Sequence, residues 1–238
     1  MFTARRKVRY SECGGDGTLT IPAIVNHFQD TSTEHSESLG VGVDYMKSIN
    51  RAWLLASWQI CICRKPRVGE DIDVQTWPTG FNGIYGDRNF VMRTPDGEVL
   101  AYANSIWLYL NTENGRPIRV EREVADKYED EAPYEMVYAP RKISSAKWDI
   151  QHEPFVIQPH HLDTNYHVNN SKYIEAGMDY IPEHFEPAQV RVEYKKAALL
   201  GDVIVPYMTE EKGRILLGLC DKEGQTYATI EWIGEYKE

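Results

Sequence analysis

Three polar side chains alternate along one short segment of the chain, Asp163, Asn165 and His167 in the sequence HLDTNYHVNN. Residues two apart point away from each other on a helix but project to the same side of an extended segment. The spacing therefore predicts an extended arm that presents a carboxylate, a carboxamide and an imidazole together. Near neutral pH an imidazole with its ordinary pKa of about 6.5 can accept a proton from water. The amide can orient a water molecule or a carbonyl group, and the carboxylate can orient the imidazole or stabilise its cation.

The same residues also fit a purely structural alternative, an ordinary polar turn. Asp and Asn side chains often accept hydrogen bonds from the backbone of the residues that follow them. A segment of this kind would satisfy its own backbone and would perform no chemistry.

A helix is predicted directly after the arm, over the sequence NNSKYIEAGMDYIP, where Pro182 stops it. Asn169 and Asn170 are candidate N-cap residues, because an Asn side chain can accept a backbone N–H group at a helix start. We expect Tyr173 to be a core or pocket-wall residue rather than an acid. The predicted apolar face of this helix comprises Tyr173, Ile174, Gly177, Met178 and Ile181.

The order of predicted elements occurs twice in the chain. A strand at RKVRYSE precedes a long amphipathic helix that starts near Ile21, with Thr18 or Thr20 as its cap and Gly40 at its end. Strand-like segments separated by turn signals follow it, and the second half repeats this order from EPFVIQ onward. The pattern predicts an α+β fold in which a long helix is wrapped by a curved antiparallel sheet, twice. Two unrelated α+β halves with the same turn chemistry are the alternative.

The boundary between the two halves is predicted in a charged segment that contains Pro133 and Pro140. This places the domains at residues 1–135 and 136–238. The helix and polar arm of the second domain carry the candidate chemistry.

Composition excludes several classes of protein. With a net charge of −10 over 238 residues, the chain is unsuited to non-specific binding of nucleic acid. No apolar run has the roughly 20 residues that a membrane span needs, and no secretory signal is visible, so we expect the cytoplasm and no membrane contact. The four cysteines lack metal-site spacing and are expected to be free thiols.

Four segments together resemble the acyl-ACP (acyl carrier protein) thioesterases. They are RAWLLASWQICICRKPRVGEDIDVQTW, GEVLAYANSIWLYLNTENGRPIRV, LDTNYHVNNSKYIE and VEYKKAALLGD, and the resemblance extends over nearly the full chain. The third, with its D-x-N-x-H-V-N-N-x-x-Y motif, is the most specific. The resemblance implies two tandem hot-dog domains and hydrolysis of fatty acyl-ACP to free fatty acid and holo-ACP. It implies Asp163, Asn165 and His167 as catalytic residues, no cofactor and no metal, in a monomer or homodimer.

The chain departs from the family pattern at one further position. Plant members of the family commonly have Glu-Cys after a Tyr-Arg-Arg segment, whereas YKKAA supplies Ala197 and Ala198 here. A cysteine nucleophile is therefore impossible at this position. We expect Asp163 and an ordered water to compensate for the missing Glu. Backbone N–H groups from Val168 to Asn170 are candidate donors to a developing oxyanion, because the first N–H groups of a helix lack internal partners.

The implied substrate has an acidic carrier and an apolar chain. Docking of the carrier favours a basic patch, and the candidates are Arg64, Lys65 and Arg67, or Arg141, Lys142 and Lys147, or Lys195 and Lys196. The acyl chain needs an apolar tunnel, which we expect between the helix and sheet of the first half. Residues available to line it are Phe28, Met46, Trp53 and Trp58.

Two rival functions stay open at this point. A hot-dog hydrolase acting on acyl-CoA would use the same water chemistry, and a non-catalytic acyl-binding protein is compatible with Ala197. Among the other histidines, His160 and His161 lack a metal-binding spacing. His27 and His35 are expected to pack within the first helix.

Overall fold

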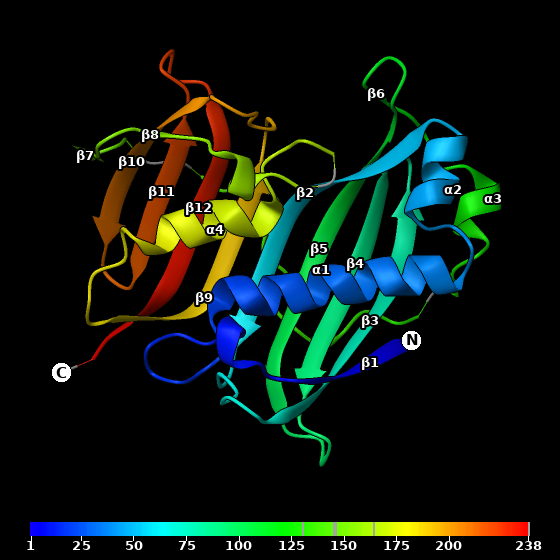
Figure 1. Cartoon of the computed structure of the whole chain (residues 1–238), viewed down its shortest axis with the longest axis horizontal. Helices are drawn as coiled ribbons and strands as arrows, with labels where there is room; N and C mark the ends of the chain where they lie inside the picture. The colour runs from blue at the N-terminus through cyan, green and yellow to red at the C-terminus, as the bar shows by residue number, and fades with distance from the viewer. Residues whose placement is uncertain (130, 145–146, 164, 238) are drawn as a thin grey trace. The chain divides into compact units, whose positions relative to one another are not determined.

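A computed structural model describes residues 1–129, 131–144, 147–163 and 165–237 of the chain. The chain divides into two compact units (Figure 1). The first contains residues 1–56 and 62–138, and the second contains residues 57–61 and 139–238. Strand β2, Arg51–Ile62, therefore supplies residues to both. The domain ranges 1–135 and 136–238 stay predictions of the sequence.

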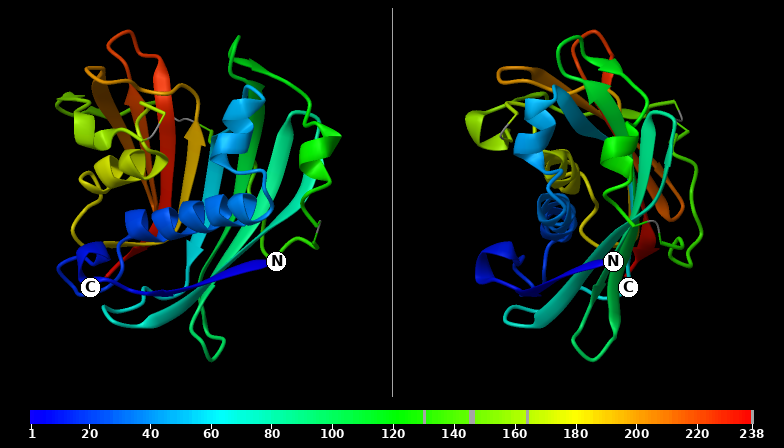
Figure 2. Two further views of the ribbon diagram at one scale, coloured as in Figure 1. Left: turned by 45° about the vertical axis from the view of Figure 1, so that its right-hand side comes forward. Right: turned by 90° about the vertical axis from the view of Figure 1, so that its right-hand side faces the viewer.

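The first unit is an antiparallel sheet with one long helix on it. Its strands are β1 Phe2–Lys7, β3 Asp71–Asn82, β4 Tyr85–Arg93 and β5 Val99–Asn111, and the sheet order is β1-β3-β4-β5-β2. The helix α1, Ile21–Ser38, lies across this sheet (Figure 2). Shorter elements are η1 Tyr10–Glu12, α2 Val43–Ser48, β6 Arg116–Pro117 and α3 Arg122–Ala125.

The first helix forms as its sequence predicts. The Thr20 side chain accepts the backbone N–H of Ala23 at 3.3 Å and caps the helix, and Gly40 follows its end with φ of 72°. Phe28 is fully buried and its ring centroid lies 5.2 Å from that of Phe90 on β4. The apolar face of α1 therefore packs on the sheet of its own unit.

The second unit repeats the architecture with a shorter helix. The helix α4, Asn170–Met178, packs on a sheet in which Ser57–Cys61 of β2 continue to β9, β12, β11, β10 and β7 in that order. The strand bounds are β7 Ile150–Gln151, β8 Phe155–Val156, β9 Phe185–Tyr194, β10 Val203–Glu211, β11 Arg214–Cys220 and β12 Thr226–Tyr236. β8 pairs with β10, and the 3-10 helix η2 is Pro159–His161.

Close packing of α4 on its sheet depends on Gly177. A Cβ atom at this position would lie 2.9 Å from the Cδ1 atom of Ile230 on β12. Because that distance is below ordinary van der Waals contact, a larger residue would push the helix off the sheet. Tyr173, Ile174 and Gly177 are buried, as the apolar face of the helix predicts.

The prediction that Ile181 continues the helical face is wrong. The helix ends at Met178, and the backbone N–H of Ile181 donates to the Met178 carbonyl in a tight turn. Pro182 explains the early end, since the residue before a proline is disfavoured in the helical region of φ/ψ space.

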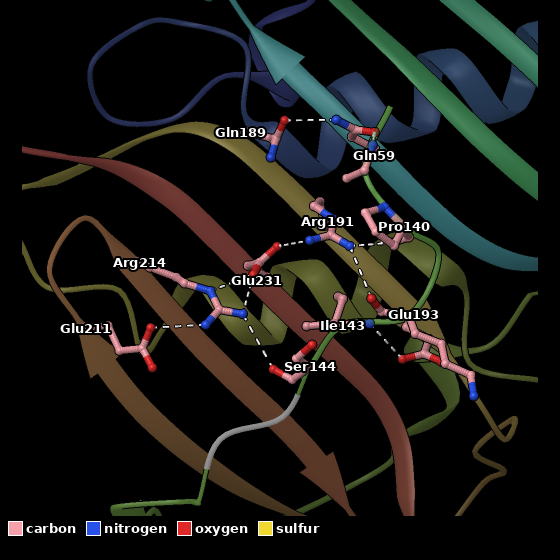
Figure 3. Close-up of polar contacts among 12 residues, drawn as sticks. Gln59, Pro140, Ile143, Ser144, Gln189, Arg191, Glu193, Glu211, Arg214 and Glu231 are labelled. Carbon is pink, nitrogen blue, oxygen red and sulfur yellow. Dashed lines mark hydrogen bonds and ion pairs between the residues drawn. The ribbon is translucent and has the colours of Figure 1, made fainter. Parts of the chain in front are cut away.

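The segment from Ala139 to Ser144 is held against the second sheet by a buried ionic cluster (Figure 3). Glu231 on β12 is only 2% exposed and accepts hydrogen bonds from Arg191 and Arg214. The same two guanidinium groups donate to the carbonyls of Pro140 and Ser144. This side-chain cluster therefore has a structural role, in which each charged group meets an opposite charge or a backbone group.

No helix in the described part of the chain is both long enough and apolar enough to cross a membrane. All four cysteines are free thiols, as predicted.

Candidate functional site

The predicted polar arm is in fact a tight turn. An antiparallel bridge between Leu162 and Val168 closes it, and Tyr166 adopts a φ of 60°. The prediction of an extended arm is therefore wrong. The cause is the side chain of Asp163, because its carboxylate accepts hydrogen bonds from backbone N–H groups later in the turn.

The Asp163 carboxylate organises the turn. Its Oδ1 atom accepts the backbone N–H of Asn165 at 2.7 Å and that of His167 at 3.2 Å. The Asp163 backbone N–H donates to the His167 carbonyl at 2.7 Å. Asp163 therefore fixes His167 through its main chain, and the carboxylate and the imidazole form no hydrogen bond within the described residues.

The turn brings all three predicted site residues together and leaves two of their side chains available. Asn165 is exposed and His167 is half-buried. Neither the Asn165 amide nor the His167 imidazole has a hydrogen-bond partner in the described part of the protein. Water can reach both groups, so the turn can present a proton acceptor and an amide donor to a ligand.

The start of α4 confirms one predicted cap and excludes two of the three predicted oxyanion donors, Val168 and Asn169, while the N–H group of Asn170 stays a prediction. Asn169 is the N-cap, and its side chain accepts the backbone N–H of Ser171 at 3.0 Å, whereas Asn170 is the first helical residue. The backbone N–H of Val168 donates to the Ala198 carbonyl at 3.0 Å, and that of Asn169 donates to the His161 carbonyl at 2.9 Å. Since both N–H groups are engaged, they are not oxyanion donors as predicted.

The segment that lacks the expected carboxylate supports the turn with its backbone. Ala198 is fully buried, its carbonyl accepts Val168, and its own N–H donates to the Tyr173 hydroxyl at 2.9 Å. Ala197 is half-buried and contributes no polar side chain. Alanine suits this buried position, because its side chain is small and its backbone N–H and carbonyl both form hydrogen bonds.

Two tyrosines beside the turn were not identified as site residues by sequence reasoning. The Tyr194 hydroxyl donates to the Asn170 carbonyl at 2.9 Å, and its ring packs edge-on against Tyr173. Burial raises the pKa of Tyr173 to about 12 and raises that of Tyr194 well above its ordinary value. Both hydroxyls are therefore neutral near pH 7 and act as hydrogen-bonding groups. The sequence signals for Tyr173 were its place on the apolar face and its position at the end of the D-x-N-x-H-V-N-N-x-x-Y motif, neither of which predicts its bond to Ala198.

A small pocket lies in the second unit next to the turn. The space between its walls is about 280 Å³ with the open solvent at its mouth included, so the enclosed part is smaller. Its walls are mainly apolar, from β8, α4, β10 and β11, and its polar contributors are His161, Lys172 and Tyr173. Burial, His160 and Lys172 lower the pKa of His161, in that order, and its Nδ1 atom accepts the backbone N–H of Gln158 at 3.0 Å. The pocket is too small for a long acyl chain.

The candidate basic clusters differ in how their charges are used. Arg64 donates to both Glu70 and Glu98, and Lys65 lies 3.0 Å from Asp16. Lys196 lies 3.3 Å from Asp221. The Lys195–Lys196 pair directly precedes Ala197 and Ala198, and Ala198 is bonded to the turn.

The residues predicted for an acyl tunnel are core residues in this structure. Phe28, Met46 and Trp58 are buried, while Trp53 is half-buried and packs against Tyr109 with a centroid separation of 4.6 Å.

Comparison with known proteins gives a consistent result over both halves of the chain. The acyl-ACP thioesterase N-terminal domain matches residues 1–128, and the acyl-ACP thioesterase C-terminal domain matches residues 145–233. A chloroplastic acyl-[acyl-carrier-protein] hydrolase of Cuphea viscosissima is 31% identical over 82% of this chain and 51% of its own length. A chloroplastic dodecanoyl-[acyl-carrier-protein] hydrolase of Cinnamomum camphora is 26% identical over 92% of this chain and 62% of its own.

Solved structures with the same fold cover nearly the whole chain. An acyl-ACP thioesterase from Bacteroides thetaiotaomicron matches with a TM-score of 0.87 and 22% identity, covering 98% of this chain and 97% of its own. The 12:0-ACP thioesterase from Umbellularia californica matches with a TM-score of 0.86 and 22% identity. The match covers 99% of this chain and 97% of that protein's chain. The predicted α+β fold of two tandem hot-dog domains is confirmed. The chain spans between about half and three-fifths of the length of the plant relatives it matches.

Proposed function

The chain belongs to the acyl-ACP thioesterase family, and on that premise we propose that it hydrolyses the thioester of fatty acyl-ACP to free fatty acid and holo-ACP. The observation that carries the proposal is the turn itself. Its half-buried imidazole and its exposed amide lie two residues apart on a backbone that Asp163 holds in place.

In the proposed reaction His167 is the general base. The imidazole removes a proton from water as the water oxygen forms a bond to the thioester carbonyl carbon. The carbon–sulfur bond then breaks, and the imidazolium returns its proton to the departing sulfur of the phosphopantetheine arm. No covalent acyl-enzyme is needed, since Ala198 has no thiol.

Asn165 is the proposed donor to the developing oxyanion. Its amide is exposed, while the backbone N–H groups of Val168 and Asn169 are already engaged. A single preorganised side-chain donor of this type contributes about 10²–10³ in rate in other hydrolases. Asp163 contributes by fixing the conformation of the turn. His167 and Asn165 can then contact the same thioester group of the substrate.

We place the carrier at Lys195 and Lys196. The two lysines adjoin Ala198, whose carbonyl binds Val168, so an acidic carrier bound there would bring its phosphopantetheine arm toward the turn. Arg64 is already paired with two carboxylates and is the weaker candidate. The location that we propose is the cytoplasm, with which four free thiols are compatible.

The experiment is a thiol-release assay with a chain-length series of acyl-ACP and the matching acyl-CoA esters. Turnover of acyl-ACP, with little turnover of acyl-CoA and none by His167→Ala, supports the proposal. Preferred turnover of acyl-CoA would identify the rival acyl-CoA thioesterase. Binding of acyl-ACP without thiol release would identify the non-catalytic acyl-binding protein, which the alanine at position 197 keeps as the second candidate.

The carrier site has its own test in the Michaelis constant. Lys196→Glu should raise KM for acyl-ACP by about tenfold at low salt, and added salt should raise KM for the unmodified protein. KM for an acyl-pantetheine without carrier should not change. Lys65→Glu is the matched control, because Lys65 pairs with one carboxylate, Asp16, as Lys196 pairs with Asp221, and belongs to a different basic cluster. An equal effect of both substitutions would remove Lys196 from the carrier site.

A further inference from the structure

The turn that carries His167 is bonded to the rest of its unit through main-chain groups. On the C-terminal side of His167, the N–H of Val168 donates to the Ala198 carbonyl, and the N–H of Asn169 donates to the His161 carbonyl. One residue later, the carbonyl of Asn170 accepts the Tyr194 hydroxyl. The direction in which the imidazole points is therefore set by the groups that hold these three backbone positions.

Two of these attachments lead to tyrosine hydroxyls. Tyr194 reaches the Asn170 carbonyl directly at 2.9 Å. Tyr173 acts through Ala198, because its hydroxyl accepts the Ala198 N–H at 2.9 Å while the Ala198 carbonyl holds Val168 at 3.0 Å. The two rings contact each other edge-on with centroids 5.6 Å apart.

Burial raises the pKa of both tyrosine hydroxyls, so these groups form hydrogen bonds and do not transfer protons. Tyr173 is 4% exposed, and its raised pKa keeps the hydroxyl neutral over the whole range in which an imidazole can act as a base. The Tyr173 hydroxyl and Ala198 are both buried, so loss of this hydroxyl leaves the Ala198 N–H without its acceptor, whereas Tyr194 is half-buried and adds a bond to the Asn170 carbonyl. The tyrosines are thus suited to hold geometry and unsuited to proton transfer.

We propose that Tyr173 and Tyr194 are positioning residues that orient the His167 turn through the backbone of Ala198 and Asn170. The kinetic part of this inference rests on the proposed hydrolysis. It also explains how this chain manages with alanine at positions 197 and 198, since the bonds that support the turn from this segment are made by backbone and not by a side chain.

The test compares three Tyr→Phe variants of the full chain. Tyr173→Phe and Tyr194→Phe each remove one bond that supports the turn. Tyr109→Phe is the matched control, because Tyr109 is fully buried and its hydroxyl donates to Glu121 at 2.8 Å, with both residues in the first unit. All three variants lose one buried hydroxyl bond, so a general loss of stability should affect them similarly.

We expect Tyr173→Phe and Tyr194→Phe to lower kcat by about ten- to a hundredfold, as small misplacements of a catalytic group do, with KM changed by less than about twofold. The ¹⁵N-labelled imidazole resonances of His167 should shift in these two variants and stay in place in Tyr109→Phe. Equal kcat in all three variants, or unmoved His167 resonances in Tyr173→Phe and Tyr194→Phe, would overturn the proposal.

The resonance measurement also separates this inference from the proposed function. If the unmodified protein releases no thiol from any acyl-ACP or acyl-CoA, the proposed hydrolysis fails. The His167 resonances then decide alone whether the two tyrosines orient the turn. If one of the two variants does not fold, the other is compared with the control under the same criteria, because each removes one of the two bonds that support the turn.

Discussion

Two histidines, one in each unit, differ in whether their imidazole is already engaged in contacts within the fold. His35 on α1 is 8% exposed, accepts a hydrogen bond from Arg88 at 3.1 Å, and stacks on Phe2. Burial first, and the charge of Arg88 second, lower its pKa to about 4. His167 is half-buried on a turn and its imidazole has no partner among the described residues. The contrast indicates that the uncommitted imidazole at the surface is the one available to a substrate.

The largest effect expected from this contrast is acid sensitivity caused by His35. Its folded pKa of about 4 lies below the ordinary value of 6.5, so the unfolded chain binds the proton more readily. The stabilisation is complete above about pH 6.5 and is lost progressively as pH falls toward 4, by up to about 3 kcal/mol. Urea denaturation across this range measures it. His35→Gln should show a smaller loss, and an unchanged pH dependence would refute the assignment.

A smaller effect is expected when the carboxylate that holds the His167 turn is removed. Asp163→Ala deletes the acceptor of two backbone N–H groups and should lower the free energy of unfolding by about 2 kcal/mol. Asp163→Asn keeps an acceptor oxygen and should retain turnover within about tenfold of the unmodified protein. Thiol release and urea denaturation on both variants check this. A complete loss of turnover in Asp163→Asn would mean that the charge itself acts in the reaction.

The smallest effect compares the caps of the two helices. Asn169→Ala and Thr20→Ala should each cost about 1 kcal/mol, because each removes one bond to an N-terminal N–H group. Only Asn169→Ala should also lower thiol release, since α4 follows the turn directly, whereas α1 lies in the other unit. Equal thiol release by the two variants would mean that the cap of α4 has no influence on the turn.

Much of the fold was predictable because local signals and burial agree. The Thr20 cap and the apolar face of α1 are each determined by neighbouring residues, and the structure confirms them. The first strand was predicted at RKVRYSE but is Phe2–Lys7, and Tyr10–Glu12 form a 3-10 helix instead. The apolar spacing predicts that α4 extends to Ile181, but the helix ends at Met178. Pro182 disfavours a helical conformation of Ile181, the residue before it.

The site was predictable in composition and not in conformation. The motif named Asp163, Asn165 and His167, but period-two spacing alone cannot separate an extended segment from a turn whose carboxylate binds its own backbone. The roles of Tyr173 and Tyr194 depend on contacts with Ala198 and Asn170, which come together only in the folded unit. Such contacts between distant residues have no local sequence signal.

The most direct test of the central claim is to compare turnover and stability in His167→Ala. Because the imidazole makes no hydrogen bond within the described residues, its removal should change the free energy of unfolding by less than about 0.5 kcal/mol. Thiol release from acyl-ACP should fall by about 10²–10⁴, the contribution of a positioned general base. Turnover equal to that of the unmodified protein would contradict the account, because the turn would then be a structural feature only.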